Sequence, residues 1–462
     1  MYSTANRLFP MFLLNRNGII GPLPPGVLED LRAGIVCALA AGADYDGLGD
    51  LSLRARRIAD LLVPDGKAGE RAWDILSAEK SGLAETVVAA TVLSNLAWAA
   101  GDLDEGMRWG RNATDLANNG IPESWRPYPC LALAEKFIDI GELDEAEMLV
   151  KAADREILDH DDHPATLDVE ISSGRLLYAS CKFRAARRRI CAAVERAAQL
   201  GTGWTTRYGL LLLALTDLRR PDLRAACDSM RKCRAEFAGD PLAHPSLQYR
   251  WGEYLVSTIG LNAQRAVEIL TEEYPELLDS PALFVMDAAA APWLVQLAQN
   301  AHDVLLATSV VASVEKLAAS NTTYPTVEAT ALHARALLGG DAEALRAAAS
   351  AHRDVWASRL AAEHLRLLDD HEELTRGVES RTVVGTTPPQ PDPDPQAWVS
   401  DVLTPTEQRI AHLVSCGMTN QQIAHALHRS THTVNYHLRR IFEKLKIKSR
   451  VELATYVLRE DG

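Results

Sequence analysis

The residues best suited to chemistry lie near the carboxyl end, where basic and polar side chains recur at helical spacing. Between Arg429 and Arg450 there are seven basic residues and one acid, Glu443, a local formal charge of 7 − 1 = +6. At 100° per residue, one face is apolar and consists of Val434, Leu438, Ile441 and Leu445. The opposite face carries His432, Tyr436, Arg439 and Glu443, with Asn435 and Lys446 at its edge. A guanidinium and an amide placed in this way can hydrogen-bond base edges or phosphates in a DNA major groove.

The elements that must position this face are short helices, and their start signals are readable. Thr404 is an N-cap, Pro405 takes the first helical position, and Glu407 completes a capping box. Further capping signals precede three more helices, namely Thr419 with Gln422, Ser430, and Ser449 with Glu452. The third helix is expected to run from 430 to 445. Short helices joined by a tight turn at 428–430 predict a helix-turn-helix module.

The charge of the chain is strongly asymmetric. The 462 residues carry 48 basic and 62 acidic side chains, a formal charge of −14. Residues 401–462 hold nine basic and six acidic residues, or +3, so residues 1–400 carry −14 − 3 = −17. An acidic body joined to a basic tip directs the tip towards a polyanion such as DNA.

The long N-terminal part contains a repeat of about 40 residues. GDLDEG begins at Gly101, GELDEA at Gly141 and CKFRAA at Cys181, followed by PDLRAA at Pro221 and LNAQRA at Leu261. A weaker relative, GDAEAL, follows at Gly340. Apolar residues at i, i+3 and i+4 flank each block, which predicts helical hairpins that stack into a solenoid resembling tetratricopeptide repeats. An irregular all-α domain with a chance periodicity is the alternative.

Composition excludes several classes of protein. The content of 47% hydrophobic and 24% charged residues is typical of a globular protein and excludes a disordered or fibrous chain. The seven cysteines form no C-x₂-C pair, so we expect neither a disulfide framework nor a zinc finger. No segment reads as a membrane span, so we expect a cytoplasmic protein. Five prolines between Pro388 and Pro395 predict an extended linker, for which an ordered surface loop is the alternative. We therefore expect helical repeats over 1–380, a linker over 381–400 and a DNA-binding module over 401–462.

The C-terminal segment resembles the LuxR-type helix-turn-helix domain of bacterial transcription regulators. The matching residues are Leu403-Thr404 with Glu407, Gly417 to Asn420, Ile423-Ala424 with Leu427, Ser430 with Thr433-Val434, His437, Lys444-Leu445 and Arg450. Thr406 and Asn435 depart from the family pattern. The pairing with helical repeats also resembles the C-terminal part of the large ATP-dependent LuxR regulators, although no G-x₄-G-K-[ST] loop is present. We therefore expect no nucleotide-binding domain and no cofactor.

The resemblance implies a dimeric, sequence-specific DNA-binding transcription regulator of bacteria, which we expect to be associated with the nucleoid. The implied base contacts are Asn435, Tyr436 and Arg439, with His432 on the same face. Phosphate contacts are expected from Thr433, His437, Arg440, Lys444, Lys446, Lys448 and Arg450. The last helix, 451–458, is the implied dimer seam. RNA polymerase and a small-molecule or protein effector of the repeats are the other candidate partners.

Alternative functions have weaker sequence support. The C-terminal helices could mediate protein contacts only, or the repeats could act as a scaffold in which DNA binding is secondary. Five of the 13 histidines lie in this module, but no acidic or cysteine partner stands at ligand spacing, so we expect no metal site. Neither a G-x-S-x-G nor an H-E-x-x-H motif occurs, so we expect no enzyme.

Overall fold

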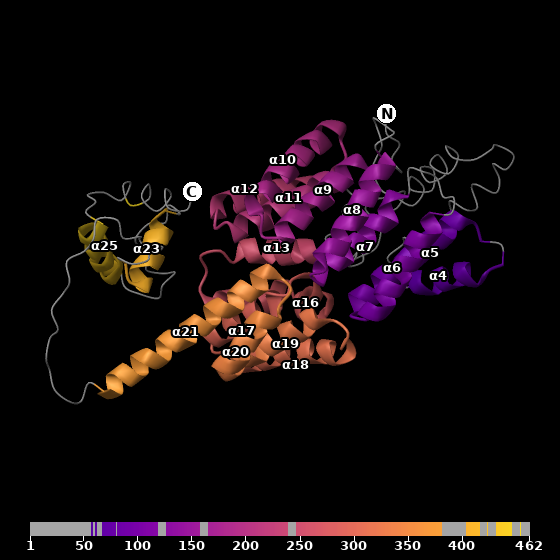
Figure 1. Cartoon of the computed structure of the whole chain (residues 1–462). Helices are drawn as coiled ribbons and strands as arrows, with labels where there is room; N and C mark the ends of the chain where they lie inside the picture. The colour runs from indigo at the N-terminus through magenta and orange to yellow at the C-terminus, as the bar shows by residue number, and fades with distance from the viewer. Residues whose placement is uncertain are drawn as a thin grey trace.

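Pairs of antiparallel helices follow one another along the chain in the computed structural model (Figure 1). The structure describes residues 57–58, 61, 67–79, 81–118, 126–157, 165–238, 246–380, 403–415, 423, 431–445 and 453, and no strand occurs among them. The predicted linker lies outside these residues. The fold class predicted from the sequence, an all-α helical-repeat solenoid followed by a helix-turn-helix domain, is confirmed.

The hairpins are built from helices of 10 to 18 residues. A first helix, α4 (Ala68–Ser77), precedes them. The pairs are α5 (Leu83–Ala100) with α6 (Leu103–Ala117), α7 (Pro127–Asp139) with α8 (Leu143–Ile157), α9 (Thr166–Ala179) with α10 (Phe183–Leu200), α11 (Gly203–Arg219) with α12 (Leu223–Ala238), α13 (Leu247–Ser257) with α14 (Ala263–Glu273), α17 (Ala290–Asn300) with α18 (Val304–Ser320), and α19 (Pro325–Gly339) with α20 (Ala342–Ala351). Two short helices, α15 (Glu276–Asp279) and α16 (Ala282–Met286), interrupt the series. The 26-residue α21 (Val355–Ser380) ends it.

One type of turn joins the two helices of several hairpins, and it explains the sequence repeat. Gly101, Gly141 and Gly340 have φ of 82°, 80° and 66°, a left-handed conformation that glycine adopts without a Cβ clash. The amide after each glycine bonds the carbonyl five residues back, as Asp102 N does to Ala97 O at 2.9 Å. This is the Schellman C-cap. The Asp102 carboxylate then accepts from Glu105 N, so one Gly-Asp step ends a helix and begins the next.

Inside the hairpins, the turns lie where the repeat predicted them, with one shift and one addition. Cys181 takes the left-handed position of its turn at φ 55°. In the repeat predicted to begin at Leu261, the left-handed residue is Gly260, one position earlier. A further turn at His302, φ 58°, had no glycine to signal it. Its second amide, Asp303 N, bonds Ala298 O at 2.8 Å in the same pattern.

The first hairpins contact the last ones, so the superhelix closes on itself. The Asn321 amide nitrogen donates to Gly101 O at 2.7 Å, and its oxygen accepts from Leu103 N at 3.0 Å, across 218 to 220 residues. Thr326 Oγ1 donates to Ile140 O in the next repeat. Because Asn321 is buried, these bonds hold two distant turns in a fixed register.

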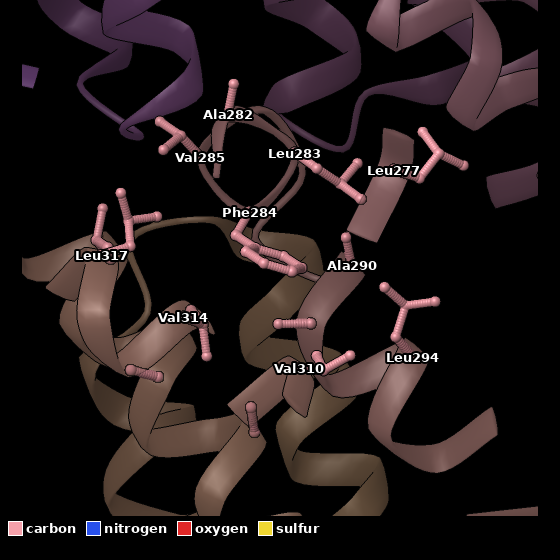
Figure 2. Close-up of a cluster of buried hydrophobic side chains, with 14 of the residues drawn as sticks. Leu277, Ala282, Leu283, Phe284, Val285, Ala290, Leu294, Val310, Val314 and Leu317 are labelled. Carbon is pink, nitrogen blue, oxygen red and sulfur yellow. The ribbon is translucent and has the colours of Figure 1, made fainter. Parts of the chain in front are cut away.

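The short helices α15 and α16 fill the interior at this closure. Figure 2 shows Phe284 directed towards the helices that carry Ala290 and Val310, with Leu283 on the side towards Leu277. Phe284 is fully buried, and burying such a side chain contributes roughly 2–3 kcal/mol. The interruption of the repeat is therefore part of the core.

Helix α5 is the one described helix long and apolar enough to cross a membrane, with a mean hydropathy of 1.4. In this structure 61% of it is buried against other helices. Its buried Ser94 hydroxyl also donates to Gly106 O of the neighbouring α6. We therefore assign α5 to the core of the repeats.

Replacing Gly101 by alanine is expected to destabilise the protein by about 2–3 kcal/mol. The left-handed conformation alone costs alanine about 1 kcal/mol. An added Cβ at Gly101 would also lie 2.9 Å from Leu317 Cδ1 and 3.2 Å from Pro281, across the closure. Gly340→Ala is the matched control, since φ is similar but nothing lies within 4 Å, and it should cost only about 1 kcal/mol. Urea denaturation measures both, and equal losses would contradict a rigid closure.

Candidate nucleic-acid interface

The C-terminal domain begins with the predicted capping box. Helix α23 (Pro405–Ser415) starts immediately after Thr404, whose amide donates to Glu407 Oε2 at 2.9 Å. Glu407 N in turn approaches Thr404 Oγ1 at 3.4 Å. The reciprocal bonds satisfy two amides that a helix start leaves without partners.

Helix α25 (Thr431–Leu445) is amphipathic in the predicted sense. Val434, Leu438 and Ile441 are buried and Leu445 is partly buried. They pack on a small core whose other buried members are Leu403, Ile410, Ala411, Val414, Ile423 and Leu453. This core fixes which way α25 is turned about its axis, so the predicted apolar stripe is confirmed.

Basic side chains lie on the rest of the α25 surface. Arg439 and Arg440 are exposed, while His437 and Lys444 are half-buried. His432, Thr433, Asn435 and Tyr436 lie on the same helix, but their side chains are outside the described ones. Lys446, Lys448 and Arg450 lie outside the described residues altogether. The structure thus brings eight of the predicted contact residues onto one helix and leaves their DNA contacts as a prediction.

A buried carboxylate joins the two described helices of the domain. Glu407 is 1% exposed, and its Oε2 accepts from Lys444 Nζ at 2.5 Å, while Arg440 Nε lies 4.0 Å from Oε1. Burial acts to raise the pKa of Glu407, but the hydrogen bonds from Lys444 and Thr404 outweigh it and leave the pKa below its ordinary value. The sequence predicts the capping role of Glu407, but a spacing of 37 residues gives no sign of its pairing with Lys444.

Among the described residues, no group of three or more histidine, cysteine, aspartate or glutamate side chains could hold a metal ion. The exposed side chains of this surface offer hydrogen-bond donors and positive charge. Exposed guanidinium groups on a rigid helix are suited to guanine edges and phosphates.

Comparison with known proteins assigns this domain to a class. Residues 401–457 match the family model of bacterial regulatory proteins, luxR family. This segment is a LuxR-type helix-turn-helix domain, a DNA-binding domain of transcription regulators, and it follows a helical-repeat region.

Two curated proteins illustrate the similarity. The chain is 48% identical over 62 residues to the transcriptional regulatory protein ComA of Bacillus subtilis (strain 168). It is 41% identical over 58 residues to the nitrate/nitrite response regulator protein NarL of Escherichia coli (strain K12). Each match spans 13% of this chain and little more than a quarter of the relative, 28% of ComA and 27% of NarL.

A Rap protein complexed with competence and sporulation factor aligns over 74% of this chain and 93% of its own. The TM-score is 0.46 and the sequence identity 13%.

Proposed function

We propose that this protein is a bacterial, sequence-specific DNA-binding transcription regulator whose helical repeats receive an effector or partner signal. The observation that carries the proposal is the orientation of α25. Its apolar stripe is buried in a core of its own domain, which leaves Arg439 and Arg440 exposed. The luxR family match over 401–457 supports the same reading, and nothing in it points to an enzyme.

In this proposal the segment 430–445 enters the major groove as the recognition helix. Asn435, Tyr436 and Arg439 contact base edges, with His432 beside them. Thr433, His437, Arg440, Lys444, Lys446, Lys448 and Arg450 contact phosphates. The contact of Lys444 with phosphate is weaker than that of a lysine without a partner, because its ammonium group also donates to Glu407.

The proposed division of the chain is repeats over 1–380, a proline-rich linker over 381–400 and the DNA-binding domain over 401–462. A single domain of this size covers little DNA surface. We therefore propose binding as a homodimer to two half-sites, with 451–458 as the dimer seam. The charge of −17 on residues 1–400 against +3 on the rest favours contact through the basic end.

Arg439→Ala is expected to weaken binding to the operator by about 1–3 kcal/mol, or about 5- to 150-fold, because a bidentate arginine–base contact is lost. Sequence preference should relax at one position of the site. The matched control is Arg346→Ala, which removes another exposed arginine, from α20 of the repeats, and should leave affinity unchanged. Genome-wide mapping of bound sites supplies the operator, and titration of labelled duplexes measures the affinities.

Unchanged operator affinity in Arg439→Ala would count against this recognition face. A protein in which DNA binding is secondary would give no discrete protected site in footprinting. Its affinity would also depend on salt alone and not on sequence, because counterion release supplies nearly all of non-specific binding.

A further inference from the structure

Two adjoining hollows lie within the repeats, between the first helices of successive hairpins and the start of α21. The larger has a cavity volume of about 320 Å³, and the smaller about 40 Å³. Both are lined by Leu215, Arg219, Trp251, Asp287 and Trp356. We call the larger hollow, with these shared residues, the repeat cavity.

Most of the repeat cavity is apolar. Beyond the shared residues its wall consists of Leu218, Leu255, Thr258, Ile259, Ala289, Trp293 and Leu360. Leucine, isoleucine and indole surfaces give no orientation to a polar group but favour an aliphatic or aromatic body. A mostly apolar hollow with a few convergent polar groups is the usual form of a small-molecule site.

The polar groups gather at one end of this cavity. Arg219 Nη2 donates to both Asp287 oxygens at 3.1 Å, and Arg219 Nε donates to Tyr178 Oη at 3.2 Å. The guanidinium carbon lies 4.4 Å from the centre of the Trp356 ring. Trp251 Nε1 donates to Asp287 Oδ2 at 3.0 Å. These contacts hold Arg219 and Trp356 side by side in a fixed geometry.

One donor at this end has no acceptor. Trp356 Nε1 is buried and makes no hydrogen bond, and it lies beside the Arg219 guanidinium, whose Nε and Nη2 are bonded to Tyr178 and Asp287. Leaving a buried donor unpaired costs about 1–3 kcal/mol. The acceptors nearby are committed, since Asp287 also accepts from Ala289 N. An oxygen brought by a ligand would satisfy the Trp356 donor.

The surrounding charge decides what kind of oxygen this is. Asp287 already balances Arg219, and Arg175 is paired with Asp139 at 2.6 Å and with Glu135. Asp354, which lines the smaller hollow, accepts from Ala357 N, and burial raises its pKa. A ligand carboxylate would add a second negative charge near Asp287 without a free cation to match it. A neutral carbonyl oxygen adds an acceptor and no charge.

We propose that the repeat cavity binds an uncharged amphipathic small molecule, with its aliphatic or aromatic body among the leucines and indoles and a carbonyl oxygen on Trp356 Nε1, beside the Arg219 guanidinium. Trp356 and Leu360 belong to the first turns of α21, which continues to Ser380, about 39 Å. Figure 1 shows α21 as a single rod extending beyond the hairpins. This step rests on the proposed function: occupancy of the cavity is the signal, and α21 transmits it along the chain towards the DNA-binding domain.

The test uses three probes with the same eight-carbon chain and different head groups: octanamide, octanoate and octylammonium. Titration calorimetry with the full-length protein, without DNA, measures binding up to about 5 mM. A ligand of about ten non-hydrogen atoms is expected to have a Kd near 1 mM, to about an order of magnitude. Octanamide should bind in a saturable manner and more tightly than either charged probe.

Two variants locate the binding. Trp356→Phe keeps the ring and removes Nε1, and should weaken octanamide about two- to tenfold. Leu255→Trp fills the apolar half and should abolish saturable binding. The matched controls are Trp73→Phe and Leu305→Trp, both at exposed positions outside the cavity, and both should bind as the unmodified protein does.

The proposal is overturned if octanamide shows no saturable binding, or if octanoate or octylammonium binds more tightly than octanamide. It is also overturned if Trp356→Phe and Leu255→Trp both bind octanamide as tightly as the unmodified protein does. Saturable binding of an apolar decapeptide in place of octanamide would likewise replace it with a peptide site. Because no assay includes DNA, failure here leaves the regulator proposal intact. Failure of operator binding in turn leaves the cavity result intact.

Discussion

Lowering the pH from about 7 to about 5 is expected to reduce the free energy of unfolding of the last repeats by about 4 kcal/mol. Two buried histidines, His333 and His352, account for this loss. Three histidine rings form a hydrogen-bonded chain there. His333 Nδ1 lies 3.2 Å from His352 Nε2, and His333 Nε2 lies 3.0 Å from His364 Nδ1. All three side chains are buried, and they join α19, the end of α20 and α21.

Burial keeps these rings neutral. It lowers the pKa of His333 to about 2, with the neighbouring rings adding to the effect, and it lowers the pKa of His352 to about 4. Burial also lowers the pKa of His364, against the opposing influence of Glu363. His352 Nδ1 is buried without a hydrogen-bond partner. A second proton on that ring would therefore place an N–H where no acceptor exists.

The lowered pKa values of these histidines make the folded state less stable in acid. Below pH 6.5 an unfolded chain protonates its histidines, whereas the folded rings stay neutral down to their lowered pKa values. The unfolded state thus binds more protons as the pH falls, and stability is lost from about pH 6.5 downwards. Two groups with an unfolded pKa of 6.5 each account for about 2 kcal/mol between pH 7 and pH 5.

Urea denaturation at the two pH values measures the loss, and two substitutions assign it. His352→Gln and His364→Asn retain a nitrogen near the bonded position and remove one titrating ring each. The pH 7-to-5 difference should shrink by about 2 kcal/mol in His352→Gln. His302→Asn, at an exposed turn position that asparagine tolerates, is the control. A pH difference that is the same in all variants would show that other groups cause the acid loss.

The local pattern of the repeats could be predicted from the sequence, because adjacent residues determine each turn. The Gly-Asp and Gly-Glu steps at Gly101 and Gly141 encode both a C-cap and the next helix start. The turn at His302 escaped because a histidine holds the left-handed position and no glycine marks it. The aromatic side chains of Trp98, Tyr128, Trp251 and Tyr254 are buried in the core of the repeats.

What joins the repeats to one another could not be predicted. The Asn321 bonds to Gly101 and Leu103 link residues about 220 apart, and nothing in a 40-residue period specifies that separation. The histidine chain likewise depends on three helices meeting at one point. Charged residues are usually exposed, so the pattern gave no reason to place Arg175 in the core between Glu135 and Asp139.

In the DNA-binding domain, helical phase predicted the buried face of α25, because four residues at i, i+4, i+7 and i+11 leave one solution for its rotation. The pairing of Lys444 with Glu407 was not predictable in the same way. It depends on how α23 crosses α25, which the packing of the small core decides. A lysine expected to contact only phosphate therefore also holds the domain together.

Glu407→Ala is accordingly expected to destabilise the DNA-binding domain by about 2–4 kcal/mol. The substitution removes a cap, worth about 1 kcal/mol, and one partner of a buried ion pair. The loss stays below that of a fully buried pair because Lys444 is half-buried and can regain water. Hydrogen exchange in the full-length protein should accelerate about 30-fold or more in α23 and α25, with α5 to α14 unchanged. Thr406→Ala, at the exposed neighbouring position, is the control.

The same substitution separates the structural role of Glu407 from its charge. Removing a carboxylate raises the local charge by one, which by itself strengthens attraction to any DNA. Loss of the contact between α23 and α25 instead disturbs the helix that carries Arg439, which weakens operator binding. We therefore expect Glu407→Ala to bind the operator less tightly while its affinity for unrelated DNA is equal or higher. If both affinities rise together and exchange in α25 is unaltered, Glu407 acts only through its charge and the ion pair with Lys444 does not position the recognition helix.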